Sequence, residues 1–301
     1  MAVREDIRLY LALFVGVVAV SFAAIFIRLA EAPSLVIAAY RLTLASLVVA
    51  PVGFVRCWRE IRGLDRTDLI FAVVSGLFLS LHFAFWIASL SYTTVASSVV
   101  FVATNALFAG VAAHLLEQDR LSGAMFGGIV VAVIGGMVIG WDDVALGGRA
   151  LWGDILALVG AIMAAGYFVA GRRLRPRVSL PAYIAVVYSI AAVGTLVLCI
   201  ITRQRFTGYS QSTYLMFILL AIVPQVIGHS SFNWALRHVS APVVGVTTLG
   251  EPIGSTVLAC IILREAPTLL KVGGGALILG GVYLSLREER LQRRRLLQTG
   301  L

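Results

Sequence analysis

Charged residues are scarce in this sequence. Only 13% of its 301 residues are Asp, Glu, Lys or Arg, whereas 60% are hydrophobic. The charges lie between long uncharged stretches such as Leu69–Leu90 and Val178–Thr202. A run of about 18 or more such residues can cross the hydrocarbon core of a bilayer as a helix. A soluble protein has no need of so many runs, so the sequence predicts an integral membrane protein.

Alternation of apolar and polar residues at a period of two is also absent, which argues against an outer-membrane barrel. Irregular backbone facing lipid is excluded because its unpaired amide groups would be costly. The connections are short, so no soluble domain is expected. The sequence predicts an all-α integral membrane protein with ten transmembrane helices, at about residues 9–28, 34–55, 69–90, 93–116, 121–141, 151–171, 178–202, 213–236, 240–263 and 268–287.

Features of enzymes and metal proteins are missing as well. Cys57, Cys199 and Cys260 have no metal-site spacing and are interpreted as small apolar residues. G-x-S-x-G, H-E-x-x-H, Walker A and Rossmann motifs are not found. We therefore expect no enzyme, no metal and no cofactor, and no obligatory protein partner is evident. Active transport would have to use an ion gradient or a partner, because an ATP-driven pump needs a nucleotide site.

The basic residues predict the orientation. If the N-terminus is cytoplasmic, 17 of the 24 Lys and Arg residues lie inside and 6 outside, while Arg41 lies within a span. The positive-inside rule then places both termini in the cytoplasm, with residues 291–301 as a basic tail. The net charge of +9 is interpreted as contact with anionic lipid headgroups and not with nucleic acid.

The two halves of the chain resemble each other. A shift of 146 residues aligns Gly127-Gly128 with Gly273-Gly274 without a gap. Each half holds five predicted helices, an odd number, so the halves enter the membrane from opposite sides. Such inverted repeats place a substrate site between the halves near the midplane. We expect one five-helix repeat over residues 1–145 and an inverted one over 146–290, around a central cavity, with the glycines allowing close helix contact.

Several motifs resemble those of a known family. Gly153-Asp154 opens the sixth predicted helix, Leu249-Gly250-Glu251-Pro252 lies in the ninth, and Leu263–Thr268 ends it. The chain is similar over nearly its whole length to the EamA-type repeats of the drug/metabolite transporter superfamily, and the amino-acid exporters of the YddG type look closest. The resemblance implies a bacterial inner-membrane location, export of small metabolites or drugs, and a cavity lined by helices one, three, four, six, eight and nine. The first half has Asn105-Ala106 in place of Glu-Pro, so a symmetric ion-coupling pair is not expected.

Helix geometry indicates which side chains lie near the midplane. Residues about 12 positions into each helix reach that depth, where polar side chains are costly and usually face a bundle interior or a water-filled path. His82 and Trp86 share a helix face, as do Gln225 and His229. The predicted substrate-binding residues are Ser21, His82, Trp86, Thr104, Asn105, Met163, Gln225, His229 and Glu251.

Glu251 and Arg41 are the charged residues predicted deep within spans. An unpaired charge there is unfavourable, so Glu251 is expected to be neutral in one state or paired with a partner such as Arg41. For both residues a role in proton coupling and a purely structural role stay open.

Aromatic walls with few polar anchors suit a small amphipathic solute. We therefore predict an inner-membrane carrier that exports small metabolites by alternating access, with amino acids of broad specificity, apolar and aromatic ones included, as substrates. The expected partners are this solute and the lipid bilayer. The alternatives are proton-coupled efflux of drugs or of other metabolites such as nucleosides, and a channel-like facilitator.

Overall fold

The regular structure is entirely helical. The computed structural model describes residues 2–117, 123–145, 148–239, 244 and 247–299, and no strand occurs in these ranges. The helices are α1 (Ala2–Ser21), α2 (Ala23–Leu29), α3 (Ser34–Arg56), α4 (Trp58–Arg62), α5 (Arg66–Ser89), α6 (Val95–Ala103), α7 (Asn105–Glu117), α8 (Gly123–Ala145), α9 (Arg149–Leu174), α10 (Leu180–Ile201), α11 (Gln211–Leu220), α12 (Ser230–Ala235), α14 (Gly250–Leu258) and α15 (Leu269–Thr299), with π-helical segments η1 (Ala221–His229) and η2 (Ala259–Leu263).

The predicted membrane-spanning character is confirmed. Seven stretches of the described chain are long and apolar enough to cross a membrane, namely Ile7–Leu29, Ser34–Arg56, Arg66–Ser89, Val95–Ala112, Arg149–Leu174, Leu180–Ile201 and Gln211–Ala235. Three shorter apolar helices, Phe126–Asp142, Gly250–Leu263 and Leu269–Leu284, coincide with the other predicted spans. The ten crossings themselves stay a prediction.

Several spans are interrupted near their middle. The fourth predicted helix breaks between α6 and α7 at Thr104, whose hydroxyl donates to the carbonyl of Phe101 at 2.6 Å. A hydroxyl that bonds back to its own helix competes with the regular backbone pattern. Pro224 lies inside η1. Proline has no backbone N–H to donate, and the wider π turn accommodates the loss of that hydrogen bond.

The last helix is longer than predicted. It continues from Leu269 to Thr299, past the expected end near residue 287. Residues 287–299 are mostly Arg, Leu, Glu and Gln, which favour helix, and this segment contains no glycine or proline. The segment predicted as a basic tail is therefore helical as far as Thr299.

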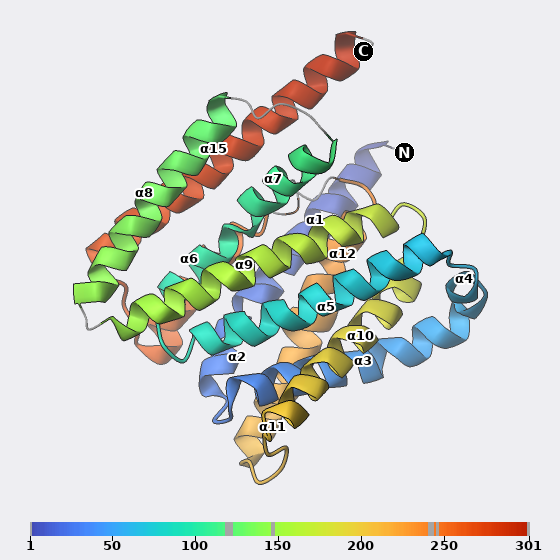
Figure 1. The fold of residues 1–301 in the computed structure, drawn as a ribbon, viewed down its shortest axis with the longest axis horizontal. Coiled ribbons are helices and arrows are strands. Elements are labelled where there is room, and N and C mark those ends of the chain that lie inside the picture. The colour runs from blue at the N-terminus through green and yellow to red at the C-terminus, as the bar shows by residue number, and fades with distance from the viewer. Residues whose placement is uncertain (1, 118–122, 146–147, 240–243, 245–246, 300–301) are drawn as a thin grey trace.

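The helices pack as antiparallel pairs. α8 lies along α15, α5 along α9, and α3 along α10 (Figure 1). Glycines bring α8 and α15 together, since a Cβ atom at Gly135 would lie only 2.6 Å from the carbonyl oxygen of Gly274. The packing expected for Gly127 and Gly273 is wrong, because an added Cβ atom at either position meets nothing within 4 Å.

Candidate functional site

A small cavity lies where the interrupted helices meet. Side chains of α1, α2, α3, α5, α6, α7, α9, η1, α12 and α14 line it, and its volume of about 20 Å³ is room for about one water molecule. The structure is thus closed around this point. Six of the residues predicted for the site line the cavity: Arg41, His82, Trp86, Asn105, His229 and Glu251.

Arg41 is the centre of this site. Its side chain is fully buried, and its Nε donates to Oε1 of Gln225 at 2.9 Å. The guanidinium carbon lies 3.9 Å from the centre of the Phe83 ring and 5.8 Å from that of Trp86. Contact with aromatic faces stabilises the cation in a buried place. Gln225 therefore orients the guanidinium and does not itself line the cavity.

Several polar atoms around the cavity have no hydrogen-bond partner within the described chain. They are Nη1 and Nη2 of Arg41, Nε1 of Trp86, Oδ1 of Asn105 and Nδ1 of His229. Buried polar groups in folded proteins are nearly always paired, so each such atom calls for a partner outside the chain. Donors and an acceptor that converge on one cavity are the features of a binding site.

Glu251 supplies the carboxylate of this site. It projects from the first turn of α14, and none of the other described side chains bonds to it or pairs with it within 4.0 Å. Arg41 lines the same cavity, so the guanidinium and the carboxyl group face a common space without a hydrogen bond or ion pair between them. That arrangement suits a ligand that carries both charges.

Aromatic rings form the walls. The rings of His82 and Trp86 are stacked with centroids 5.7 Å apart, and those of His82 and His229 lie 6.5 Å apart. Nδ1 of His82 lies 2.9 Å from the carbonyl oxygen of Gly160. Because a carbonyl only accepts, this nitrogen carries the proton, and the imidazole is held in one orientation.

Three predicted residues face elsewhere. The hydroxyl of Ser21 donates to the carbonyl of Val17 at 2.8 Å, and its own carbonyl accepts from Ser255. Met163 is half-buried on α9 and Thr104 lies at the α6–α7 break, and neither lines the cavity. These residues were selected by their depth along a helix, and depth does not specify the direction of a side chain.

Other lining residues were not predicted. Tyr167, Phe168, Phe232 and Thr248 border the cavity. The Tyr167 hydroxyl bonds to the side-chain amide of Asn233 at 2.9 Å, which holds the ring in place. Tyr167 lies one helical turn after Met163, so an extension of the depth count by one turn along the same helix face would also have found it.

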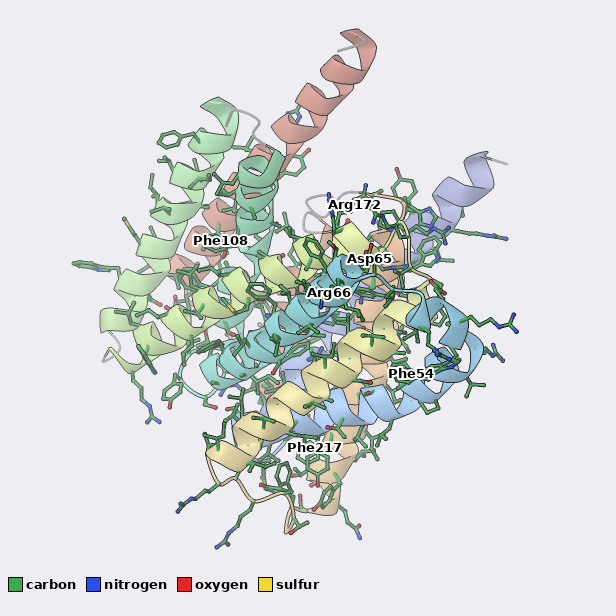
Figure 2. The ribbon with its side chains drawn as sticks, turned by 45° about the vertical axis from the view of Figure 1, so that its right-hand side comes forward. Phe54, Asp65, Arg66, Phe108, Arg172 and Phe217 are labelled. Atoms are coloured by element: carbon green, nitrogen blue, oxygen red, sulfur yellow. The ribbon has the colours of Figure 1, made fainter. Side chains whose placement is uncertain are left out.

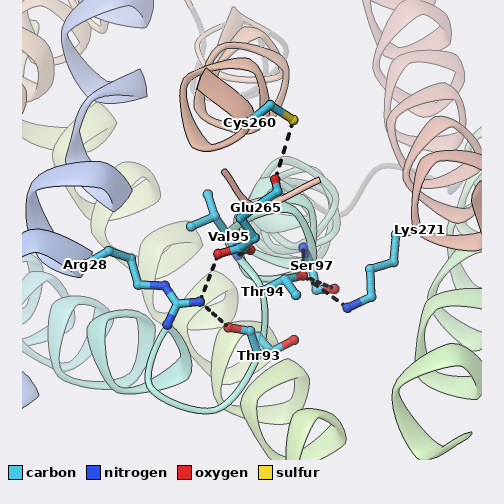
Figure 3. Close-up of polar contacts among 8 residues, drawn as sticks. All are labelled: Arg28, Thr93, Thr94, Val95, Ser97, Cys260, Glu265 and Lys271. Atoms are coloured by element: carbon cyan, nitrogen blue, oxygen red, sulfur yellow. Dashed lines mark hydrogen bonds and ion pairs between the residues drawn. The ribbon is translucent and has the colours of Figure 1, made fainter. Parts of the chain in front are cut away.

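A cluster of polar contacts around Glu265 lies at one end of the helices that line the cavity. One carboxylate oxygen of Glu265 accepts from Arg28 at 3.0 Å and the other from the backbone N–H of Val95 at 2.5 Å (Figure 3). Arg28 also donates to the carbonyl of Thr93, and Nζ of Lys271 lies 3.1 Å from the Thr94 hydroxyl. We call Arg28, Val95 and Glu265 the Glu265 cluster. It ties together α2, α6 and the segment after η2, and α2 and α6 both run from here to the cavity.

The opposite end is held by arginines at the end of α9. Arg172 donates to the carbonyl of Leu236 at 2.6 Å, and Arg175 donates to the carbonyl of Asn233 at 2.8 Å. Arg172 lies at the same end as Asp65 and Arg66, where α5 begins (Figure 2). Burial lowers the pKa of Arg175 below its ordinary value, and the bonds to carbonyl oxygens favour its charged form.

The site offers no set of metal ligands. Within the part of the chain that the structure describes, no group of three or more His, Cys, Asp or Glu side chains is placed to hold a metal ion.

Comparison with known proteins supplies the context for this geometry. The model of the EamA-like transporter family matches twice, over residues 7–141 and 151–287. An uncharacterized transporter of Archaeoglobus fulgidus is 25% identical over 92% of this chain and 96% of its own length. One from Clostridium kluyveri is 24% identical over 74% of this chain and 73% of its own.

Solved structures share the fold. One crystal structure is 22% identical and matches with a TM-score of 0.67, covering 93% of this chain and 97% of its own. At that identity the likeness concerns the fold alone.

Proposed function

This chain belongs to the EamA-like transporter family, and from that membership we propose that it is a carrier of small zwitterionic solutes, chiefly amino acids. The observation that carries the proposal is the set of unpartnered polar atoms around one cavity. A membrane transporter must replace the water around its solute, and these atoms are the groups that would do so.

An amino acid would use both charges of the site. Its carboxylate would accept from Nη1 and Nη2 of Arg41, whose planar fork matches a carboxylate, and from Nε1 of Trp86. Its ammonium would lie toward Glu251 and toward Oδ1 of Asn105. Its side chain would contact the rings of Phe168 and Phe232, which favours apolar and aromatic amino acids.

Sugar phosphates and nucleotides suit this cavity less well. A phosphate site normally gathers several cations, whereas Arg41 is the sole Arg or Lys among the described residues that line the cavity. Neutral nucleosides and cationic drugs would leave the guanidinium without a counter-charge.

We propose further that the chain is an inverted repeat. The glycine contacts between α8 and α15 support it. Gly135 approaches the carbonyl of Gly274, and Gly281 approaches that of Gly128. Gly274 and Gly281 are the counterparts of Gly128 and Gly135 under the 146-residue shift. A reciprocal contact of this kind is what a two-fold axis between equivalent elements produces.

The same symmetry supports alternating access in ten crossings. The closed cavity favours a carrier over a channel, since a channel needs a continuous path. We place both termini on the cytoplasmic side of a bacterial inner membrane, on the basis of the 17 basic residues that this orientation puts inside. The Glu265 cluster would then seal the outer end of the site.

Transport in liposomes tests the proposal. The purified protein would be reconstituted and assayed for counterflow of labelled amino acids, sugar phosphates, nucleosides and cationic drugs. We expect saturable flux of amino acids that is accelerated by unlabelled amino acid on the far side. Counterflow of a sugar phosphate without counterflow of amino acids would refute the substrate assignment. Flux that does not saturate would indicate a channel.

Loss of the Glu265 charge should open the sealed end. Glu265→Gln removes the ion pair with Arg28 and weakens the bond from the Val95 N–H, and a bond to a charged group contributes about 1.5–3 kcal/mol. We expect a cysteine at the cavity position Val102, in a chain whose three native cysteines are replaced by serine, to react roughly tenfold faster with a membrane-impermeant maleimide.

The matched control is Glu31→Gln. Glu31 is exposed near the same end as Arg28, and neither of the ion pairs found among the described residues involves it. Equal labelling in Glu265→Gln, in the control and in the parent would show that the cluster does not govern access.

A further inference from the structure

A second, much larger cavity lies on the flank of the molecule. Residues of α6, α7, α8, α9 and α15 enclose a volume of about 730 Å³, which we call the lateral groove. Phe108 of α7 borders it (Figure 2), together with Gly140 of α8, Ile155 of α9 and Ile278 of α15. Its lining comes from the α8–α15 pair on one side and from α6, α7 and α9 on the other, and Figure 1 shows how these helices are arranged.

The lining of the lateral groove is hydrocarbon in character. Two lining residues carry an oxygen on their side chain, and both have partners within the protein. The Thr104 hydroxyl donates to the carbonyl of Phe101, and Oδ1 of Asp154 accepts from the Thr93 hydroxyl at 2.9 Å. A polar solute would lose its hydration here without replacement, so the occupant must be apolar.

The groove opens onto the face that lipid covers. At its rim, Met137 is 67% exposed and Trp141 is 76% exposed, and both belong to a helix apolar enough to lie in a membrane. The rim is therefore continuous with the surface that acyl chains cover. The acyl chains of neighbouring lipids fill a void of this size beside a bilayer.

Groups suited to a lipid headgroup lie at one end of the groove. Arg149 is exposed at the start of α9, two residues before the groove residue Leu151, and its guanidinium lies 5.4 Å from the centre of the Tyr92 ring. Trp141 and Trp152 are exposed near the same end, and tryptophans gather at the level of the headgroups. An arginine at this level attracts a lipid phosphate.

We propose that the lateral groove is a binding site for one phospholipid, with an acyl chain in the groove and its phosphate at Arg149. This site is separate from the central cavity and does not depend on which solute the protein carries. It holds the α8–α15 pair to the bundle through hydrocarbon contacts that protein side chains leave unfilled.

Native mass spectrometry of the full chain in detergent, titrated with phosphatidylglycerol, tests the site. We expect one tightly bound phospholipid on the parent protein. Gly140→Phe should fit, because an added Cβ atom would lie 3.5 Å from Leu151, an ordinary contact, and its ring would occupy the groove. We expect it to lower the affinity for lipid roughly tenfold. Ile155→Trp fills the groove from the opposite wall and should do the same if Gly140→Phe folds poorly.

Gly127→Phe is the matched control on the same helix. Its added Cβ atom meets nothing within 4 Å, and the position does not line the groove, so lipid binding should be retained. Arg149→Gln should weaken phosphatidylglycerol but leave an uncharged fatty alcohol unchanged. Equal binding by the groove variants and the control would refute the site. A fatty alcohol that binds the parent as tightly as phosphatidylglycerol would refute the headgroup contact.

Discussion

Arg41→Lys is expected to lower kcat/KM for amino acids roughly 10- to 100-fold. The guanidinium offers two parallel N–H donors to a carboxylate, while its Nε is held by Gln225. A lysine ammonium keeps the charge but cannot reproduce this fork, and each hydrogen bond to a charged group contributes about 1.5–3 kcal/mol. The measurement compares an amino acid with its decarboxylated amine in counterflow. The variant should lose the preference for the amino acid.

The control for Arg41→Lys is Arg175→Lys. Arg175 is equally buried, but it lies at the end of α9, where it bonds to carbonyl oxygens and does not line the cavity. Its replacement should lower thermal stability without changing the preference between the two solutes. If Arg41→Lys reduces the flux of the amine and the amino acid equally, Arg41 supports the fold and does not bind the carboxylate.

Glu251→Gln is expected to abolish dependence on a pH gradient while exchange of solute for solute continues. An ionised Glu251 strengthens the binding of a solute ammonium without being essential for it. In the empty carrier the ionised carboxylate has no bonded partner, and an unpaired charge costs at least about 2.5 kcal/mol at the bilayer centre. If Glu251 takes up a proton while the carrier returns without solute, the carboxylate loses its charge. Solute export is then coupled to proton uptake, which is an antiport. The amide side chain of the variant is neutral throughout, so it permits return without a proton.

Liposome flux with and without an imposed pH gradient measures this coupling. Glu251→Asp, which keeps a titratable group, should retain part of the gradient dependence. A wild-type rate that is indifferent to the gradient would remove Glu251 from energy coupling and leave it a role in binding or in packing beside Pro252.

The helices were largely predictable because the residues that specify each of them lie within the same short segment of the sequence. A run of apolar residues between charges specifies a span, and most predicted boundaries lie within a few residues of those observed. The interruptions within the spans were harder to predict from the sequence. A proline such as Pro224 always lacks the backbone N–H, so an irregular helix at that position can be expected from the sequence. The break at Thr104 instead depends on a hydroxyl that bonds back to the carbonyl of Phe101. Threonine in many helices makes no such break.

The sequence predicted how far along each helix the site residues lie, but not the direction in which their side chains point. Counting residues from the helix ends placed His82, Asn105 and Glu251 at the height of the cavity, and they line it. Ser21 and Met163 were selected by the same count but do not line the cavity. Which way a residue faces depends on the rotation of each helix against its neighbours. That rotation is fixed by tertiary contacts such as the bond from Ser255 to Ser21, between residues far apart in the sequence.

The break between α6 and α7 has a thermodynamic consequence. Thr104 borders the lateral groove, while its neighbour Asn105 borders the central cavity, so the same short stretch of chain separates the two spaces. To admit a solute, the cavity has to expand from about 20 Å³, and any outward movement of this stretch takes its volume from the groove. Solute and lipid would then compete at a distance, and by linkage each would weaken the affinity for the other by the same factor. The lipid composition of the membrane would thereby set the apparent affinity of the carrier for its solute.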